Sequence, residues 1–262
     1  DYKLETTNYL SLTQEGINSD ALSKNFQDAI YIARHLGISY LWIDSLCILQ
    51  DCENDWAKES SAMRLVYTNA ACVISATASK DSNGGCFRKR PAPSETWSLV
   101  TSKKTRYYLS AHKPSIKTLF DTRVETAPLT KRAWAFQERL LSRRLVHFCS
   151  DVVLFECDTM QASEFDEQGS GYEKLPYVVH NGRLFDWQIE FNQRWYRLVS
   201  AYSEGALTYP TDKLVAISGI AELVQDRAQT PYVAGLWMIE PGEKQLLYCA
   251  PSWSWASVNG RI

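Results

Sequence analysis

Apolar residues recur at helical spacing early in the chain and then run together in a short block. Phe26, Ile30 and Ala33 lie three or four positions apart, which predicts a helix over about 23–36. A glycine follows this stretch and is a typical stop signal. The block Ile38–Ile43 comes next and is typical of a buried parallel strand.

The same alternation repeats once further along. A second helix is expected to begin near Asp55, and Trp56, Met63 and Tyr67 share one of its faces. The apolar run Ala71–Ala78 then predicts a second buried strand. Helices and strands in alternation indicate an α/β fold built on a parallel sheet.

The remaining pattern mixes strands and helices. The expected elements are short strands in 97–109, a helix over 129–141, a hairpin of 145–148 with 152–157, a mobile loop over 161–175, helices over 187–202 and from about 211, and strands and turns in 232–237, 245–249 and 252–258.

Composition narrows the class of protein. The chain has 262 residues and a formal charge of −2, which gives no argument for a nucleic-acid partner. No apolar stretch approaches the roughly 18–20 residues that span a bilayer, and no secretory signal opens the sequence. Seven cysteines without a C-x-x-C pair favour reduced thiols over disulfides or a metal site. We therefore expect a cytoplasmic protein without a membrane span or a bound metal.

Two places in the first third of the chain carry candidate chemistry. Asp44 and Ser45 follow the predicted strand directly, where open α/β sheets bind ligands, although both side chains are also typical of a turn. Glu59 lies three residues after Trp56, and a carboxylate beside an indole can work as an acid or a base. The alternative is a solvated helix face on which Glu59 pairs with a basic residue.

A third candidate lies in the predicted helix over 129–141. Arg132 and Arg139 could hold a phosphate or a carboxylate, and Gln137 and Glu138 lie between them. The alternative is a structural network of Arg and Glu side chains that links this helix to the rest of the fold.

Taken together, these stretches resemble the fungal heterokaryon incompatibility (HET) domain family. The matching segments, in the family's order, are Leu22–Ile30, Tyr40–Asp51, Asp55–Trp56 with Glu59 and Met63, Tyr67–Ala70 and Arg132–Ser142. Ala250–Val258 resembles the region that often follows a HET domain. The family usually opens with a strand and turn of the form Leu-Ser-Tyr-Cys-Trp-Gly. This sequence has no counterpart to it, so the leading strand of the sheet is expected to be missing.

The resemblance implies a fold and a role. It implies a TIR-like or flavodoxin-like parallel sheet with flanking helices in a HET domain over 1–157. A mixed α+β extension over 158–262, with two helices and short strands, would be packed on that domain. HET proteins act in fungal non-self recognition and programmed cell death, so a protein partner or self-association is expected.

A remote likeness of HET domains to TIR domains implies an activity, because some TIR domains cleave NAD⁺ with a glutamate beside a tryptophan. That glutamate would be Glu59, and the enzyme would be NAD⁺ glycohydrolase-like. NAD⁺ would be its substrate, and no cofactor is firmly implied. The binding residues would be Asp44, Ser45, Trp56, Arg132, Gln137, Glu138 and Arg139.

Two other functions fit the same sequence. One is a non-catalytic signalling module that acts by self-association or by binding a partner. The other is a specialised-metabolism enzyme on a HET scaffold, with an apolar pocket lined by the tryptophans of the C-terminal half: Trp187, Trp195, Trp237, Trp253 and Trp255. An open aromatic cavity would favour the enzyme, and a solid aromatic core would count against it.

Overall fold

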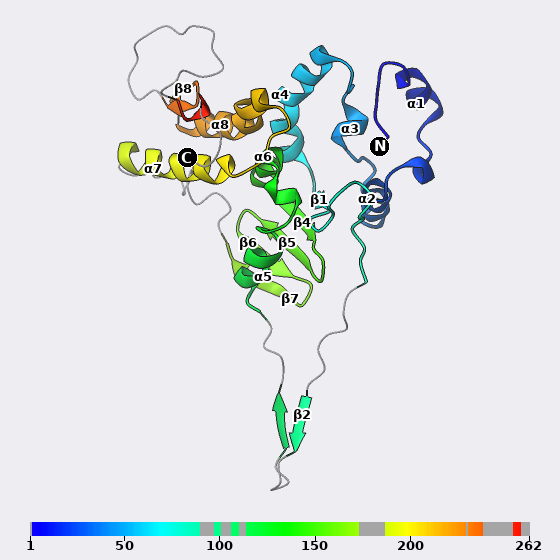
Figure 1. Ribbon diagram of the computed structural model, residues 1–262, viewed down its shortest axis with the longest axis vertical. Coiled ribbons are helices and arrows are strands. Elements are labelled where there is room, and N and C mark those ends of the chain that lie inside the picture. The colour runs from blue at the N-terminus through cyan, green and yellow to red at the C-terminus, as the bar shows by residue number, and fades with distance from the viewer. Residues whose placement is uncertain are drawn as a thin grey trace.

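The computed structural model describes residues 2–89, 97–100, 106–109, 114–172, 187–228, 230–237 and 254–257. These residues form a mixed α/β structure with helices flanking a five-stranded sheet (Figure 1). The α-helices are α1 (Tyr9–Glu15), α2 (Lys24–His35), α3 (Asp44–Cys47), α4 (Glu53–Asn69), α5 (Ile116–Arg123), α6 (Ala133–Leu141), α7 (Trp187–Ser203) and α8 (Val215–Ala228). The strands are β1 (Val73–Ser75), β2 (Trp97–Val100), β3 (Arg106–Leu109), β4 (Arg144–Phe148), β5 (Val153–Cys157), β6 (Met160–Ser163), β7 (Asp166–Gly171), β8 (Tyr232–Val233) and β9 (Leu236–Trp237).

Long periodic segments form the helices that the pattern predicts. α2 and α4 match the two helices expected in the first third of the chain, and α6, α7 and α8 match the three expected later. α2 ends where Gly37 adopts φ 68°, a left-handed conformation that a residue with a Cβ rarely takes. Its inward face buries Ala33 and one carboxylate, Asp28.

The large sheet is mixed, so the expectation of a parallel sheet is wrong for most of its strands. Its order is β1-β4-β5-β6-β7, and only β1 and β4 run parallel. The hairpin of β4 and β5 is confirmed, with Val146 paired to Phe155. The stretch 161–175 is not simply a loop, because β6 and most of β7 occupy it through residue 171. Short connections between successive strands favour these antiparallel pairs.

The segment Ile38–Ile43 is not a strand, which corrects a second expectation. Its backbone is extended at Ile43, with φ −135° and ψ 122°, but it has no ladder to any described strand. The side chain of Tyr40 is 91% exposed. A run of apolar residues indicates burial, but a strand also needs a hydrogen-bonded neighbour, and β1 takes β4 as its partner.

Two apolar clusters hold the described elements together. The smaller cluster packs α5 against the sheet. It includes Phe120 of α5, Val124 just after α5, and Leu154 of β5. The larger one joins α6, α7 and α8 beside α4 (Figure 1). It buries three tryptophans of the C-terminal half, namely Trp195, Trp237 and Trp255. These rings build core, which counts against an aromatic substrate pocket. The side chains of Trp187 and Trp253 lie outside the described residues, as does the segment 245–249.

Candidate functional site

The candidate residues before α4 lie at the start of the short helix α3. Asp44 is the first residue of α3, and its Oδ1 accepts a hydrogen bond of 2.7 Å from the Ser45 amide. The Asp44 side chain is exposed, whereas the Ser45 Oγ is buried without a hydrogen-bond partner among the described residues. The Ser45 carbonyl accepts the amide of Leu4 at 2.8 Å, which fixes this turn against the N-terminal segment.

The α4 face places an indole and a carboxylate one turn apart. Trp56 is 38% exposed, and its ring meets the ring of Trp134 on α6 edge-on, with 6.5 Å between centroids. Glu59 follows on α4 with its side chain 25% exposed, and its Oε1 lies 3.2 Å from the Lys58 Nζ. The Lys58 side chain is 77% exposed, so this ion pair is weak and leaves Glu59 available.

Asp44 and Glu59 lie near a common neighbour, the thiol of Cys47. Burial raises the pKa of Cys47, and the negative charges of Asp44 and Glu59 raise it further. The thiol therefore stays protonated at neutral pH and is a poor nucleophile. The same observation shows that the two carboxylates both lie near Cys47.

A second carboxylate lies close to Asp44, between α4 and α6. The Tyr67 hydroxyl and the Glu138 carboxyl group lie close enough to affect each other's pKa values. Burial raises the pKa of Glu138 to about 7, because the charge of Arg132 and the nearby Tyr67 hydroxyl oppose the effect only in part while Asp44 adds to it. We call Asp44, Tyr67, Arg132 and Glu138 the carboxylate cluster. It brings together three of the residues that the sequence singled out.

Gln137 and Arg139 lie beside Glu138 in α6 but point elsewhere. The buried Gln137 accepts the Gly219 amide at its Oε1, at 2.8 Å, and so ties α6 to α8. Arg139 binds Glu156 through two hydrogen bonds of 2.7 and 3.0 Å and Glu125 through one of 2.8 Å. These contacts correspond to the structural network that was the alternative for this helix.

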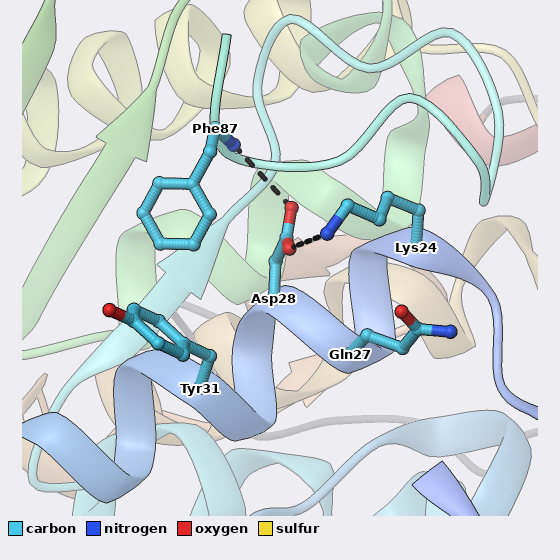
Figure 2. A pocket seen from close by; sticks show the side chains of 5 residues that line it. All are labelled: Lys24, Gln27, Asp28, Tyr31 and Phe87. Atoms are coloured by element: carbon cyan, nitrogen blue, oxygen red, sulfur yellow. Dashed lines mark hydrogen bonds and ion pairs between the residues drawn. The ribbon is translucent and has the colours of Figure 1, made fainter. Parts of the chain in front are cut away.

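A hollow of about 440 Å³ lies elsewhere, between α2 and the loop that ends at Phe87 (Figure 2). Asp28 lies at its base and is 2% exposed. Its carboxylate accepts the Cys86 amide at 2.8 Å and pairs with the Lys24 Nζ at 2.6 Å, and the Phe87 amide lies 3.4 Å from the same oxygen as Cys86. Asp28 therefore fastens this loop to α2, and none of the predicted site residues lines the hollow.

Tyr67 is the member of the carboxylate cluster that sequence reasoning did not assign to the site. It lies four residues after the buried Met63 on α4, so the pattern indicates packing rather than chemistry. Its ring does pack, edge-on against Trp42 with 5.9 Å between centroids. Its hydroxyl could have indicated a polar neighbour, because the hydroxyl of a buried tyrosine usually finds a hydrogen-bond partner.

Other kinds of site find no support in the part of the chain that the structure describes. No group of three or more histidine, cysteine, aspartate or glutamate side chains is arranged there to hold a metal ion. Among the same residues, no helix combines the length and apolarity needed to cross a membrane.

Comparison with known proteins gives one match. The profile of a family described as "Heterokaryon incompatibility protein (HET)" matches residues 3–138, slightly more than half of the chain. The match includes the carboxylate cluster and the Trp56–Glu59 pair, and it ends at Glu138. No curated protein and no solved structure matches the chain significantly.

Proposed function

The chain belongs to the heterokaryon incompatibility (HET) family, and on that basis we propose that it acts in fungal non-self recognition and programmed cell death by cleaving NAD⁺. The observation that carries the proposal is Glu59, half-buried one turn after the exposed indole of Trp56 and, like Asp44, near the Cys47 thiol. The remote likeness of HET domains to TIR domains supports the choice of substrate by analogy of fold.

Each candidate residue has a part in the proposed reaction. Trp56 offers an exposed ring on which the nicotinamide or the adenine stacks. Arg132, whose side chain is exposed at the start of α6, pairs with the pyrophosphate. Asp44 accepts hydrogen bonds from the ribose hydroxyls, as a carboxylate readily does. Glu59 stabilises the positive charge that develops on the ribose.

The reaction is the hydrolysis of an N-glycosidic bond. The bond between the ribose C1′ and the nicotinamide nitrogen breaks, and its electron pair stays with the nicotinamide, which leaves as a neutral molecule. A water oxygen bonds to C1′ and loses one proton. The products are ADP-ribose, nicotinamide and that proton, so no oxidant or further reactant is needed.

The test is NAD⁺ consumption by the purified protein over a range of protein concentrations, with the Glu59→Gln variant alongside. We expect at least a 100-fold slower loss of NAD⁺ in the variant, because the amide keeps the shape but not the charge. The matched control is Glu53→Gln, an exposed carboxylate in the first turn of the same helix, which should leave the rate unchanged. Equal rates for wild type and Glu59→Gln would contradict the role of Glu59.

Self-association or partner binding without catalysis is the second candidate function. It is favoured by large apolar side chains exposed in the N-terminal third, which include Leu10 at 67%, Leu36 at 56% and Tyr40 at 91%. Assembly that grows with protein concentration while NAD⁺ stays intact would support this function. A protein that stays monomeric and binds no partner would contradict it.

We also propose a cytoplasmic location. Six of the cysteines are described, and all six carry free thiols. Reduced cysteines are typical of a reducing compartment such as the cytosol. The same compartment would supply NAD⁺ to the site.

A further inference from the structure

We propose that the hollow beside α2 is a binding site for a small molecule that joins a flat aromatic ring to an anionic group. The hollow measures about 440 Å³, which lies within the range of small-molecule sites in proteins. Four of its five lining residues belong to α2, and the fifth is Phe87 (Figure 2). Neither Trp56 nor Glu59 lines it, so the inference does not rest on the proposed NAD⁺ cleavage.

One wall of the hollow is a stripe along α2. The stripe consists of Lys24, Gln27, Asp28 and Tyr31, which stand at positions i, i+3, i+4 and i+7 of the helix. Asp28 lies at the base and is 2% exposed, whereas the Lys24 side chain and Tyr31 are each 53% exposed. This wall therefore offers a cation and an aromatic ring about two helical turns apart.

The opposite wall is a loop that specific contacts hold against α2. Gly85 comes so close to the helix that a Cβ at this position would lie 2.7 Å from the Asp28 Oδ2, and its φ of 72° also favours glycine. The Gly85 amide donates to the Asn25 Oδ1 at 2.7 Å, and the Asn25 amide donates to the Ser82 carbonyl at 3.0 Å. The hollow is thus formed before any ligand arrives, as small-molecule sites usually are.

Two aromatic rings make a rigid corner in the hollow. The rings of Tyr31 and Phe87 meet edge-on, with 5.5 Å between centroids. Each ring has a further support, because the His35 ring lies 3.9 Å from Tyr31 and the Phe148 ring of β4 meets Phe87 at 5.9 Å. Tyr31 and Phe87 nevertheless stay about half exposed, at 53% and 48%. A third ring can stack in this corner at little cost in side-chain entropy.

The accessible charge of the hollow favours an anion. The Asp28 Oδ1 pairs with the Lys24 Nζ at 2.6 Å, and its Oδ2 accepts the Cys86 amide at 2.8 Å. An ammonium group carries three donors, of which the bond to Asp28 uses one. A cationic ligand would meet the exposed charge of Lys24, whereas a phosphate or carboxylate accepts hydrogen bonds from it.

The arrangement of these groups defines the ligand further. Figure 2 shows the Lys24 ammonium and the rings of Tyr31 and Phe87 on opposite sides of Asp28. A ligand that uses both sides stacks its ring in the aromatic corner and directs its anionic group across Asp28 to Lys24. A nucleoside monophosphate and an aromatic acid with a short side chain share this chemistry.

The first test is isothermal titration calorimetry on the whole chain. AMP and indole-3-acetate join a ring to an anion, adenosine and indole carry the ring alone, and inorganic phosphate carries the anion alone. We expect a Kd on the order of 0.01–1 mM for AMP or indole-3-acetate, and binding about tenfold weaker for either half. Binding of AMP supports a nucleotide as the source, and binding of indole-3-acetate supports an aromatic acid. If neither binds at about 10 mM, or if one half binds as tightly as the whole, the inference is overturned.

A second test locates the bound ring. Phe87→Leu keeps an apolar side chain but removes the stacking ring, and should weaken binding about 5- to 100-fold. Phe165→Leu is the matched control, because this phenylalanine between β6 and β7 is 50% exposed, and the Kd should not change. Trp56→Leu should not change it either. Loss of binding in Trp56→Leu but not in Phe87→Leu would place the ligand on α4 and overturn the inference.

A third test separates the charge of Lys24 from its contact with Asp28. Lys24→Gln should weaken binding of the joined probe about 3- to 10-fold and leave binding of the ring half unchanged. Lys24→Arg keeps the charge and should bind as the wild type does. Lys117→Gln removes a similar ion pair, with Asp121 on α5, and should have no effect. If Lys24→Gln weakens both probes equally, Lys24 acts only by holding the loop through Asp28, and its role toward the anion is wrong.

Discussion

The two sides of α6 hold their carboxylates in different ways. On one side Glu156 of β5 is fully buried and receives two hydrogen bonds from Arg139, while the His147 Nε2 lies 3.3 Å from its Oε1. On the other side lies Glu138, the residue before Arg139, which is half-buried. The Tyr67 hydroxyl and the charge of Arg132 lower its pKa, whereas the charge of Asp44 raises it. We call Arg139, His147 and Glu156 the buried ion cluster.

The pKa values of the two carboxylates separate accordingly. Burial alone would raise the pKa of Glu156, but the nearby His147 ring, the charge of Arg139 and the hydrogen bonds from Arg139 hold it well below its usual range. The pKa of Glu138 is raised to about 7, because burial and Asp44 outweigh Arg132 and Tyr67. The neighbouring groups therefore decide that Glu156 stays ionised, whereas Glu138 can take up and release a proton near neutral pH. Of the two, only Glu138 can act as an acid or a base in this range.

The largest effect is expected from breaking the buried ion cluster. Arg139→Met leaves Glu156 without its main cation inside the fold, and removing one partner of a buried pair typically costs about 3–5 kcal/mol. We expect a loss of that order in the free energy of unfolding, measured by urea denaturation. Arg143→Met, an exposed arginine just after α6, is the control and should change the stability by less than about 0.5 kcal/mol. A loss below about 1 kcal/mol for Arg139→Met would show that the cluster does not hold β5 to α6.

The comparison also shows what a sequence can and cannot predict here. The helices and the hairpin of β4 and β5 follow from periodicity and turn residues, because both signals are local. The buried strand expected at Ile38–Ile43 is wrong, since strand formation depends on a neighbour that the local pattern does not specify. In the same way, neither Glu138 nor Arg139 reveals its partner, because Tyr67 and Glu156 lie on other elements. Spacing along α6 predicts which side each residue faces but not what it meets there.

The next effect concerns the pH dependence of stability on the Glu138 side. The folded-state pKa of Glu138, about 7, lies above its ordinary value of 4.5. The folded state therefore binds more protons than the unfolded state between these values, and its stability falls as pH rises from about 4.5 to 7. Glu138→Gln should remove a decline on the order of 1–3 kcal/mol over this range. Urea denaturation of both proteins at pH 5 and pH 8 measures it, and the same difference in wild type and variant would contradict the assignment.

The smallest effect is expected at the rim of the buried ion cluster. Glu125 also pairs with Arg139, at 2.8 Å, but its side chain is 50% exposed, so water screens the charge and replaces the lost contact. Glu125→Gln should therefore cost only about 0.2–1 kcal/mol in urea denaturation, far less than Arg139→Met. The guanidinium keeps both bonds to Glu156 in this variant, so the anion inside the fold stays compensated. A loss as large as that of Arg139→Met would mean that Glu125, rather than Glu156, is the partner that makes Arg139 important for stability.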